Sequence, residues 1–378
     1  MGLSRALARW AVRRCHVLVV EVPGATGQRI AVERAVAARS WVLAQSPAEA
    51  DVLTVCGRPG PGMQEVVARL WDHLPGPRTR VDVVVPEGAE AALDAAATAL
   101  LEDAPHREDA RSRTDAGVQD HGDTDHGDMD HGDMDHGDTD HGDTDHGDTD
   151  HGDTDMPMPG GIRTGSGRED RDGLEIDVLH VAQGPVLPHW PAGLVLTCTL
   201  QGDVVVEATA EVLDPAEDPG GPGTGDPRRD VLVSRCDSAA RLLAVAGWDS
   251  AAGEARRVRD RCLDGAPLAE CAAPLEHLAR RVARSRSLRW SLRGSRTATG
   301  PDDHEGVELL DRLRGWLEQA RAAGRAPEDA GTGTGRDAGP VPPEALPDLV
   351  TGLDLAAVRL VVAGADVAVV RAPEVAGA

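Results

Sequence analysis

The chain of 378 residues contains no phenylalanine and no tyrosine, and its seven tryptophans are the only large aromatic side chains. Lysine and asparagine are absent too, so all 39 basic residues are arginines. Any hydrophobic core must therefore be built mainly from Val, Leu and Ala. The sequence also has no run of 18 or more apolar residues, so no membrane-spanning helix is expected.

Cysteine is scarce and scattered. No two cysteines form a Cys-x-x-Cys pair, which excludes a zinc ribbon and a thioredoxin motif. Isolated cysteines of this kind are usually buried thiols of a protein in a reducing compartment. The N-terminal stretch lacks the apolar region and cleavage site of a signal peptide, so the cytoplasm is the expected location. The six residues are Cys15, Cys56, Cys198, Cys236, Cys262 and Cys271.

Basic charge is in deficit. The formal net charge is -25, but 15 of the 64 acidic residues lie in residues 120–155. The rest of the chain has 49 acidic residues against 39 basic ones, which argues against nucleic acid as a main partner. One local exception is the basic run Arg280–Arg289, with Arg293 and Arg296 nearby. It is either a solvated helix face paired with local acids or a docking site for an acidic partner or for the protein's own Asp-rich segment.

Residues 120–155 form the clearest pattern in the chain. They contain seven tandem copies of His-Gly-Asp-Thr/Met-Asp, and a period of five fits neither a helix nor a strand. Each copy offers at most one Met as an apolar group, which cannot offset the entropy lost on ordering. A disordered, solvated tether is expected here, within a linker of residues 105–170. The copies begin at His121, His126, His131, His136, His141, His146 and His151.

The same repeat predicts an ability to bind divalent metal ions. Imidazole binds Zn, Ni or Cu, and Met129 and Met134 add soft thioethers. Repetition raises the effective concentration of these ligands, so several His can gather on one ion although none is pre-positioned. Two interpretations stay open: a linker with incidental metal affinity, and a segment selected for metal storage or delivery.

Three alternations of strand and helix are expected before the linker. Short β-branched runs indicate strands buried on both faces, and each is followed by helical spacing. The alternation predicts a parallel sheet with right-handed crossovers in a domain of residues 1–104. Gly24–Gly27 has neither the Gly-x-Gly-x-x-Gly spacing nor the Gly-Lys-Ser/Thr ending of phosphate-binding loops. A plain turn is therefore favoured over a phosphate-binding loop. The expected strands are 16–22, 51–56 and 80–85, and the expected helices are 28–41, 63–74 and 89–102.

The block 171–325 is expected to be an α+β domain. The turn signal Gln201-Gly-Asp203 between β-branched runs predicts a hairpin, beside a further strand. Helical spacing then predicts a bundle. Residues 326–378 hold a Gly/Pro linker and a C-terminal segment in which 353–362 is either helix or strand. The expected strands are 174–181, 193–200 and 204–212, the Pro-rich loops 184–193 and 214–229, and the helices 238–247, 253–263, 268–292 and 305–323.

The N-terminal block carries the stretch Ser46-Pro-Ala-Glu-Ala-Asp-Val-Leu-Thr-Val-Cys-Gly57. Met63 and Leu70-Trp-Asp-His-Leu-Pro-Gly-Pro77 follow it. In this order and spacing the block resembles, over about residues 15–85, the 20 kDa subunit of NADH:quinone oxidoreductase (respiratory complex I) and the related small subunit of membrane-bound nickel-iron hydrogenases.

That family uses four cysteines to hold a [4Fe-4S] cluster. The resemblance places Cys15 on one ligand position, if Glu21 matches the acidic residue that follows the family's first cysteine motif. Leu18 stands where a second cysteine belongs, and Pro86-Glu-Gly88 replaces another. Cys56 falls at a position that is not a ligand in the family. An intact cluster is therefore not expected.

The C-terminal block carries Gly184, Pro185 and Pro188, followed by Leu194-Val-Leu196 and Gly202-Asp-Val-Val205. This pattern resembles the start of the 49 kDa, hydrogenase large-subunit-like component of the same complexes. In complex I a His of that loop helps to line the quinone headgroup site. Leu187 and Pro191 fall near the family's His positions here. His189, a neighbour out of register, is either a quinone contact or a loop histidine that packs beside Trp190. The partner Tyr of that site has no counterpart in a chain without tyrosine.

Together these predictions give an α/β protein. It has a three-layer, flavodoxin-like parallel-sheet half-domain, a disordered His/Asp tether, and an α+β domain with a β-hairpin and a helical bundle. The first functional hypothesis is an accessory or degenerate subunit of a complex I-like or hydrogenase-like assembly, contacting other subunits of a membrane-associated redox complex. Peripheral attachment to the inner face of the cell membrane is left open. The alternatives are a His-rich divalent-metal binding or delivery protein and an active [4Fe-4S] electron-transfer subunit.

Overall fold

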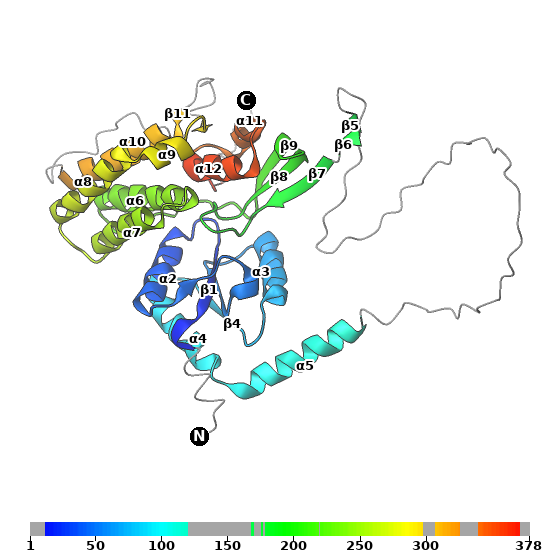
Figure 1. Cartoon of the computed structure of the whole chain (residues 1–378). Helices are drawn as coiled ribbons and strands as arrows, with labels where there is room; N and C mark the ends of the chain where they lie inside the picture. The colour runs from blue at the N-terminus through cyan, green and yellow to red at the C-terminus, as the bar shows by residue number, and fades with distance from the viewer. Residues whose placement is uncertain are drawn as a thin grey trace, which may run out of the picture.

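The computed structural model describes residues 12–119, 168–169, 175–176, 178–218, 220–297, 307–325 and 339–370. The His-Gly-Asp repeat, expected to be a tether, lies outside these residues, as does the segment 326–338. The described residues form a mixed α/β fold with a parallel sheet, an antiparallel sheet and a helical region (Figure 1).

The N-terminal unit is built around a four-stranded parallel sheet. Its strands are β1 (His16–Glu21), β2 (Val42–Leu43), β3 (Val52–Cys56) and β4 (Thr79–Val83), in the order β2-β1-β3-β4. Helix α2 (Thr26–Ala38) connects β1 to β2, and α3 (Pro61–His73) connects β3 to β4. The expected parallel sheet is confirmed. The edge strand β2 is additional, because two residues are too few to show a periodic pattern.

Helices lie on both sides of this sheet (Figure 1). Helix α2 packs against α4 (Ala89–Ala99) on one side, and α3 covers the other. All five residues of β3 are buried, as are Val17 and Val20 of β1, which explains the continuous β-branched runs. Helix α5 (Asp103–Gln119) extends away from the sheet, and Arg78 anchors its first half through an ion pair with Asp109 at 2.9 Å.

The C-terminal unit begins with an antiparallel sheet in the order β7-β8-β9. These strands are β7 (Val178–Gln183), β8 (Leu194–Gln201) and β9 (Val204–Val212), so the expected hairpin is confirmed. Gly202, with a φ of 63°, turns the chain between β8 and β9. The buried side of β8 packs in one core with α11 (Leu346–Val350) and α12 (Leu355–Ala365). The C-terminal segment whose type the sequence left open is therefore helical.

The helical region contains α6 (Pro227–Val245), α7 (Asp249–Leu263), α8 (Leu268–Arg284), α9 (Arg286–Ser291) and α10 (Leu309–Arg325). The single helix expected over 268–292 is wrong, because Ser285 has an extended backbone and its hydroxyl caps α9 by accepting from the amide of Leu288 at 3.2 Å. The loop expected to reach residue 229 ends earlier, because Asp226 caps α6.

Four short strands of the described residues pair as two antiparallel ribbons. No described helix is long and apolar enough to cross a membrane. The short strands are β5 (Arg168–Glu169), β6 (Glu175–Ile176), β10 (Arg296–Thr297) and β11 (Val307–Glu308).

Candidate functional site

The loop of residues 184–193 is held at both ends by glycines that nothing larger could replace. Gly184 has a φ of 91°, and a Cβ there would lie 2.1 Å from the carbonyl oxygen of Leu194. The indole of Trp190 donates to the same oxygen at 2.8 Å, which fixes the loop from within. Gly193 has a φ of 70°, and a Cβ there would lie 2.8 Å from the ring of Pro23 in the N-terminal unit. The loop is therefore pinned against the end of β1.

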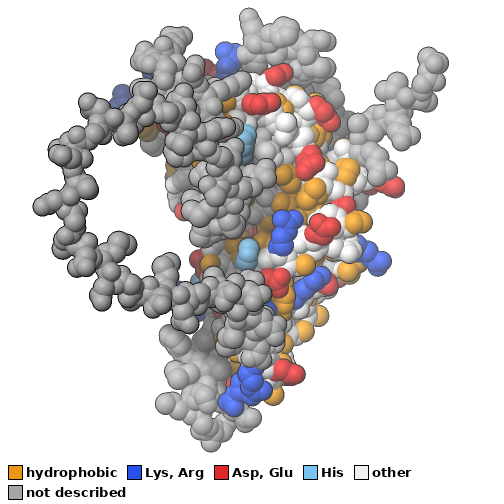
Figure 2. All heavy atoms as spheres, turned by 90° about the vertical axis from the view of Figure 1, so that its right-hand side faces the viewer, with side chains coloured by type: hydrophobic (Ala, Val, Ile, Leu, Met, Phe, Trp, Pro, Cys, Tyr) orange, Lys and Arg blue, Asp and Glu red, His pale blue; other side chains and the backbone are white. Residues whose placement is uncertain are grey.

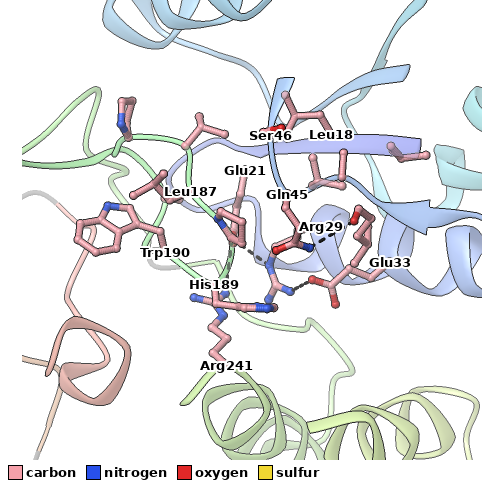
Figure 3. A pocket seen from close by; sticks show the side chains of 18 of the residues that line it. Leu18, Glu21, Arg29, Glu33, Gln45, Ser46, Leu187, His189, Trp190 and Arg241 are labelled. Carbon is pink, nitrogen blue, oxygen red and sulfur yellow. Dashed lines mark hydrogen bonds and ion pairs between the residues drawn. The ribbon is translucent and has the colours of Figure 1, made fainter. Parts of the chain in front are cut away.

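His189 is the most unusual residue of this loop. Its φ of 62° lies in the left-handed region, which is uncommon for a residue with a side chain. Backbone strain of this kind persists where the surrounding structure enforces it, and it concentrates at binding sites. The conformation directs the half-buried imidazole toward α2 and α6, among the arginines and carboxylates of both units (Figure 3).

A cavity of about 230 Å³ lies between this loop, β1, the segment after β2 and α6 (Figure 3). One part of its wall is apolar and the other is charged. The volume is slightly below the range of about 300–1,000 Å³ of typical small-molecule sites, so a compact ligand is the largest that fits. The apolar wall comprises Leu18, Leu43, Leu70, Val186, Leu187 and Trp190.

The charged part of the cavity contains His189, Arg241 and Arg256. Burial, and then the neighbouring Arg256, lower the pKa of His189 to about 4, so the imidazole is neutral near pH 7. It therefore offers one hydrogen-bond donor and one acceptor. Arg241 is paired with Glu21 and Asp237, whereas Arg256 makes no ion pair with any acid in the described part of the chain. Arg256 thus leaves a guanidinium available at the cavity wall.

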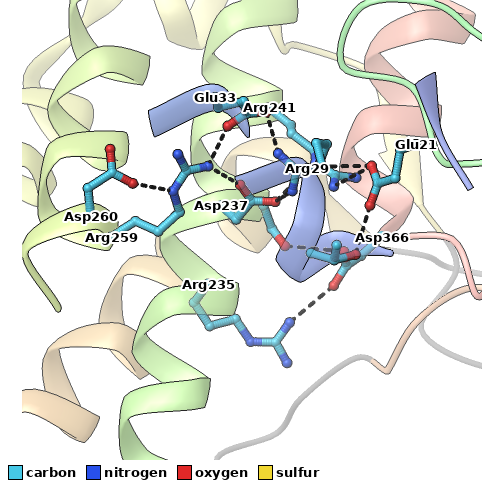
Figure 4. A network of polar contacts seen from close by, with 11 residues as sticks. Glu21, Arg29, Glu33, Arg235, Asp237, Arg241, Arg259, Asp260 and Asp366 are labelled. Carbon is cyan, nitrogen blue, oxygen red and sulfur yellow. Dashed lines mark hydrogen bonds and ion pairs between the residues drawn. The ribbon is translucent and has the colours of Figure 1, made fainter. Parts of the chain in front are cut away.

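Beneath the cavity, a buried network of charges joins the two units (Figure 4). Arg29 of α2 forms ion pairs with Glu21 of β1 at 2.9 Å and with Glu33 one turn further along α2. Its third partner is Asp237 of α6, at 2.6 Å. The guanidinium of Arg29 is therefore surrounded by carboxylates from both units.

Arg259 of α7 makes the second connection between the units. It contacts Glu33 of the N-terminal unit at 2.8 Å and Asp237 at 2.6 Å, while Asp260 lies beside it at 2.9 Å. Burial alone would raise the pKa of Glu33, but Arg29 and Arg259 lower it to about 2. The pKa of Asp237 is also far below its usual range, because the pull of Arg29, Arg241 and Arg259 exceeds the effect of burial. Glu33 and Asp237 are therefore charged near pH 7.

The crevice at the carboxyl end of the parallel sheet is filled by the chain itself. The strand order reverses between β1 and β3, and in open α/β sheets ligands bind beside such a point. Here the carboxylate of Asp214, just after β9, accepts from the amides of Met63 at 2.7 Å and Gly62 at 3.4 Å. These amides begin α3 and are the donors that would bind a phosphate.

The turn at Gly24–Gly27 is likewise covered. A Cβ at Gly220 would lie 1.9 Å from the carbonyl oxygen of Gly24, so two backbones are in close contact there. The hydroxyl of Thr26, at the start of α2, donates to Glu21 at 2.8 Å. These contacts agree with the expected plain turn and leave little space for a phosphate at this turn.

The structure does not bring the two predicted cofactor residues together. His189 lines three adjoining cavities, whereas Cys15 lines none of them. Cys15 is 2% exposed at the start of β1, and its thiol donates to the carbonyl oxygen of Val12 at 3.3 Å. Burial, and then Asp51, raise its pKa to about 12, so it is a protonated thiol near pH 7. Cys56 is fully buried within β3, and its pKa is raised as well.

These donors do not fit a [4Fe-4S] cluster. All six cysteines belong to the described residues and are buried, and no three His, Cys, Asp or Glu of that part of the chain are arranged to hold a metal ion. The predicted metal ligands of the repeat, from His121 to His151, lie outside the described residues. Their metal binding stays a prediction.

Sequence reasoning missed the buried charge network. Arg29, Asp237 and Arg259 sit on helices, where charged residues ordinarily indicate solvated positions. One signal was present: Glu21 ends a strand that is otherwise expected to be buried, so it needs a cationic partner. The pattern does not indicate which of 39 arginines supplies it.

Comparison of the chain with protein-family models, curated proteins and solved structures finds no match in any of the three. The resemblance of the two blocks to respiratory subunits therefore stays a prediction. The mixed α/β fold and the geometry of the cavity are supported by the structure and by no relative.

Replacing Asp237 by Asn should lower the free energy of unfolding by about 3–5 kcal/mol, because the buried guanidinium groups of Arg29 and Arg259 and the half-buried one of Arg241 lose a shared carboxylate. Urea unfolding followed by circular dichroism measures the change. The matched control is Asp82→Asn, which breaks an exposed pair with Arg80 and should cost less than about 0.5 kcal/mol. Equal losses for the two variants would contradict the assignment of the network as the joint between units.

A second prediction concerns pH. His189 has a pKa of about 4 in the folded chain, against about 6.5 when unfolded, so the unfolded state binds more protons between these values. The stability seen at neutral pH should therefore be lost as pH falls from about 6.5 toward 4, by up to about 1.4 kcal/mol per pH unit. His189→Asn, which tolerates the left-handed backbone, should remove this part of the slope. Urea midpoints from pH 7 to 4.5 test it, and parallel slopes for the two proteins would refute it.

Proposed function

We propose that this chain is an accessory, non-catalytic subunit of a complex I-like or membrane-bound hydrogenase-like assembly. The supporting observation is that the two blocks that resemble different subunits are in contact. The loop with the Gly184-Pro185 motif of the 49 kDa resemblance is pinned on the end of β1, within the 20 kDa resemblance. In the complexes concerned, the corresponding two subunits contact each other near the cluster. A single chain that keeps both parts in contact would retain the docking architecture of that interface.

The strand order supports the finer fold assignment within this proposal. A flavodoxin-like sheet has the order 2-1-3-4-5, and the observed order β2-β1-β3-β4 corresponds to its first four strands. We therefore include a flavodoxin-like half-domain in the proposal. The described part of the N-terminal unit has no fifth strand beyond β4, where such a sheet would continue.

The thiol environment supports a non-catalytic role. Cluster assembly needs several deprotonated thiolates around one volume. Cys15 is protonated and bonded to a backbone carbonyl, and Leu18, at the second ligand position of the resemblance, lines the apolar cavity instead.

The cavity suits a small quinone-like ring. Neutral His189 can donate to a carbonyl oxygen, and Arg256 lies at the same wall without an ion pair among the described residues. Leu18 and Leu187 offer apolar contacts to the ring face. In this proposal the cavity keeps the binding of a headgroup while the reduction of that headgroup is lost.

Binding of a benzoquinone with one isoprenoid unit tests the proposal by titration calorimetry. His189→Asn and Arg256→Gln should each weaken binding about tenfold, since a hydrogen bond contributes on the order of 1 kcal/mol and one to a charged group more. The matched control Arg69→Gln, on the exposed side of α3, should leave binding unchanged.

Two outcomes would contradict the proposal in different ways. Absence of quinone binding by the intact protein would remove the headgroup site while leaving the subunit assignment to be tested by co-purification with intact 20 kDa and 49 kDa-type subunits. Four irons and matching sulfide per chain, after anaerobic isolation, would replace it with the active [4Fe-4S] alternative.

A second candidate function, metal handling, is favoured by the repeat alone. Seven histidines at five-residue spacing give many equivalent ligands for Ni or Zn. The full chain should take up Ni²⁺ in calorimetric titration, and a variant lacking residues 121–155 should lose this uptake. Binding should weaken as pH falls through about 6.5, because neutral imidazole is the ligand.

A second variant distinguishes metal binding by the imidazoles of the repeat from metal binding by its carboxylates. Replacing the seven histidines of the repeat by Ser keeps all its aspartates, and this variant should bind as little Ni²⁺ as the deletion. Unchanged uptake after the deletion would exclude the repeat as the metal site.

A further inference from the structure

The surface formed by the end of α8 and by α9 carries charge of one sign. Residues 277–297 contain seven arginines and no acidic residue. Arg281 is paired with Glu254 of α7, which uses one of the seven. Arg284, Arg286, Arg289 and Arg293 are exposed and make no ion pair with any acid in the described ranges. We call these four residues and Trp290 the α9 surface.

The fold exposes the α9 surface to solvent. Leu288 and Leu292 are 3% and 1% exposed and belong to the core that includes α6 and α10. Arg286 and Trp290 are spaced at i and i+4 on α9, so they share the opposite face, and Arg293 is exposed just after the helix ends. Trp290 is 80% exposed, more than any other large apolar side chain among the described residues. An indole is thus held in solvent between guanidinium groups.

We propose that the α9 surface docks this protein on a membrane that contains anionic lipids. Tryptophan is enriched at the headgroup level of membranes, where its apolar ring and its N–H are both satisfied. Clustered arginines at the same level attract anionic headgroups. The two features occur here within eight residues of one short segment.

The composition of the α9 surface favours a membrane over a protein partner. Arginine and tryptophan are enriched in protein interfaces too, but the core of such an interface contains several packed apolar side chains. The α9 surface has one apolar side chain, and Ser287 and four arginines are its neighbours in the sequence. Acidic and basic side chains are interspersed on the face drawn in Figure 2, so a surface of single sign is not general to this protein.

Co-sedimentation with lipid vesicles tests the proposal on the full chain. The protein should sediment with vesicles of phosphatidylcholine and phosphatidylglycerol, not with phosphatidylcholine alone, and salt should weaken the binding. Each arginine near a membrane contributes about fivefold, so the triple variant R286Q/R289Q/R293Q should bind about 100-fold more weakly. Trp290→Ser should weaken binding without changing the salt dependence.

The matched control removes the same charge elsewhere. The variant R58Q/R69Q/R111Q replaces three exposed arginines of the N-terminal unit and should bind vesicles as the natural chain does. Urea midpoints of all variants establish that they fold. Equal binding by the two triple variants, or no binding of the full chain to anionic vesicles, would overturn the proposal. Binding to poly-aspartate without binding to vesicles would assign the surface to an acidic protein and overturn it as well.

Discussion

The arrangement of the whole chain depends on one buried set of charges. The N-terminal unit contributes Glu21, Arg29 and Glu33, and the helical region contributes Asp237, Arg241 and Arg259. Two carboxylates flank Arg29 in the first set, and two guanidinium groups flank Asp237 in the second, with Asp260 beside Arg259. The ion pairs of Arg29 and Arg259 with carboxylates of the other unit form only when the two units are joined. The energetic penalty of an unpaired buried ion makes one relative orientation of the units far more favourable than others.

This joint also determines the shape of the candidate site. The cavity lies between the loop of residues 184–193 and the charge network (Figure 3). Its charged wall is formed by residues of the network, and its apolar wall comes mainly from β1 and the loop. His189 is held neutral and strained at the boundary between them. The charged groups around the cavity are paired with one another, and Arg256 is the exception among the described cations that line it.

The parts that sequence patterns predicted are those controlled by local rules. Period-two and β-branched runs placed β1, β3, β4 and the β8–β9 hairpin within a few residues. The Gly-Asp turn and the pinned loop glycines were visible as motifs.

The break at Ser285 was missed because apolar spacing continues through it to Leu288 and Leu292. The network was missed because ion pairs between residues 208 positions apart, as for Arg29 and Asp237, leave no periodic trace. The cavity follows from that contact, so His189 could be named but its surroundings could not.

The carboxylate of Asp214 at the first turn of α3 has a consequence for what this sheet can recognise. A tethered group competes at an effective concentration of millimolar order, so dilute soluble phosphates would not displace it. The amides that serve nucleotide recognition in many α/β proteins are here satisfied internally, by a residue of the second unit. The amides at the start of α3 thus hold two halves of one polypeptide together, and the cavity lined by His189 lies at the contact between these halves.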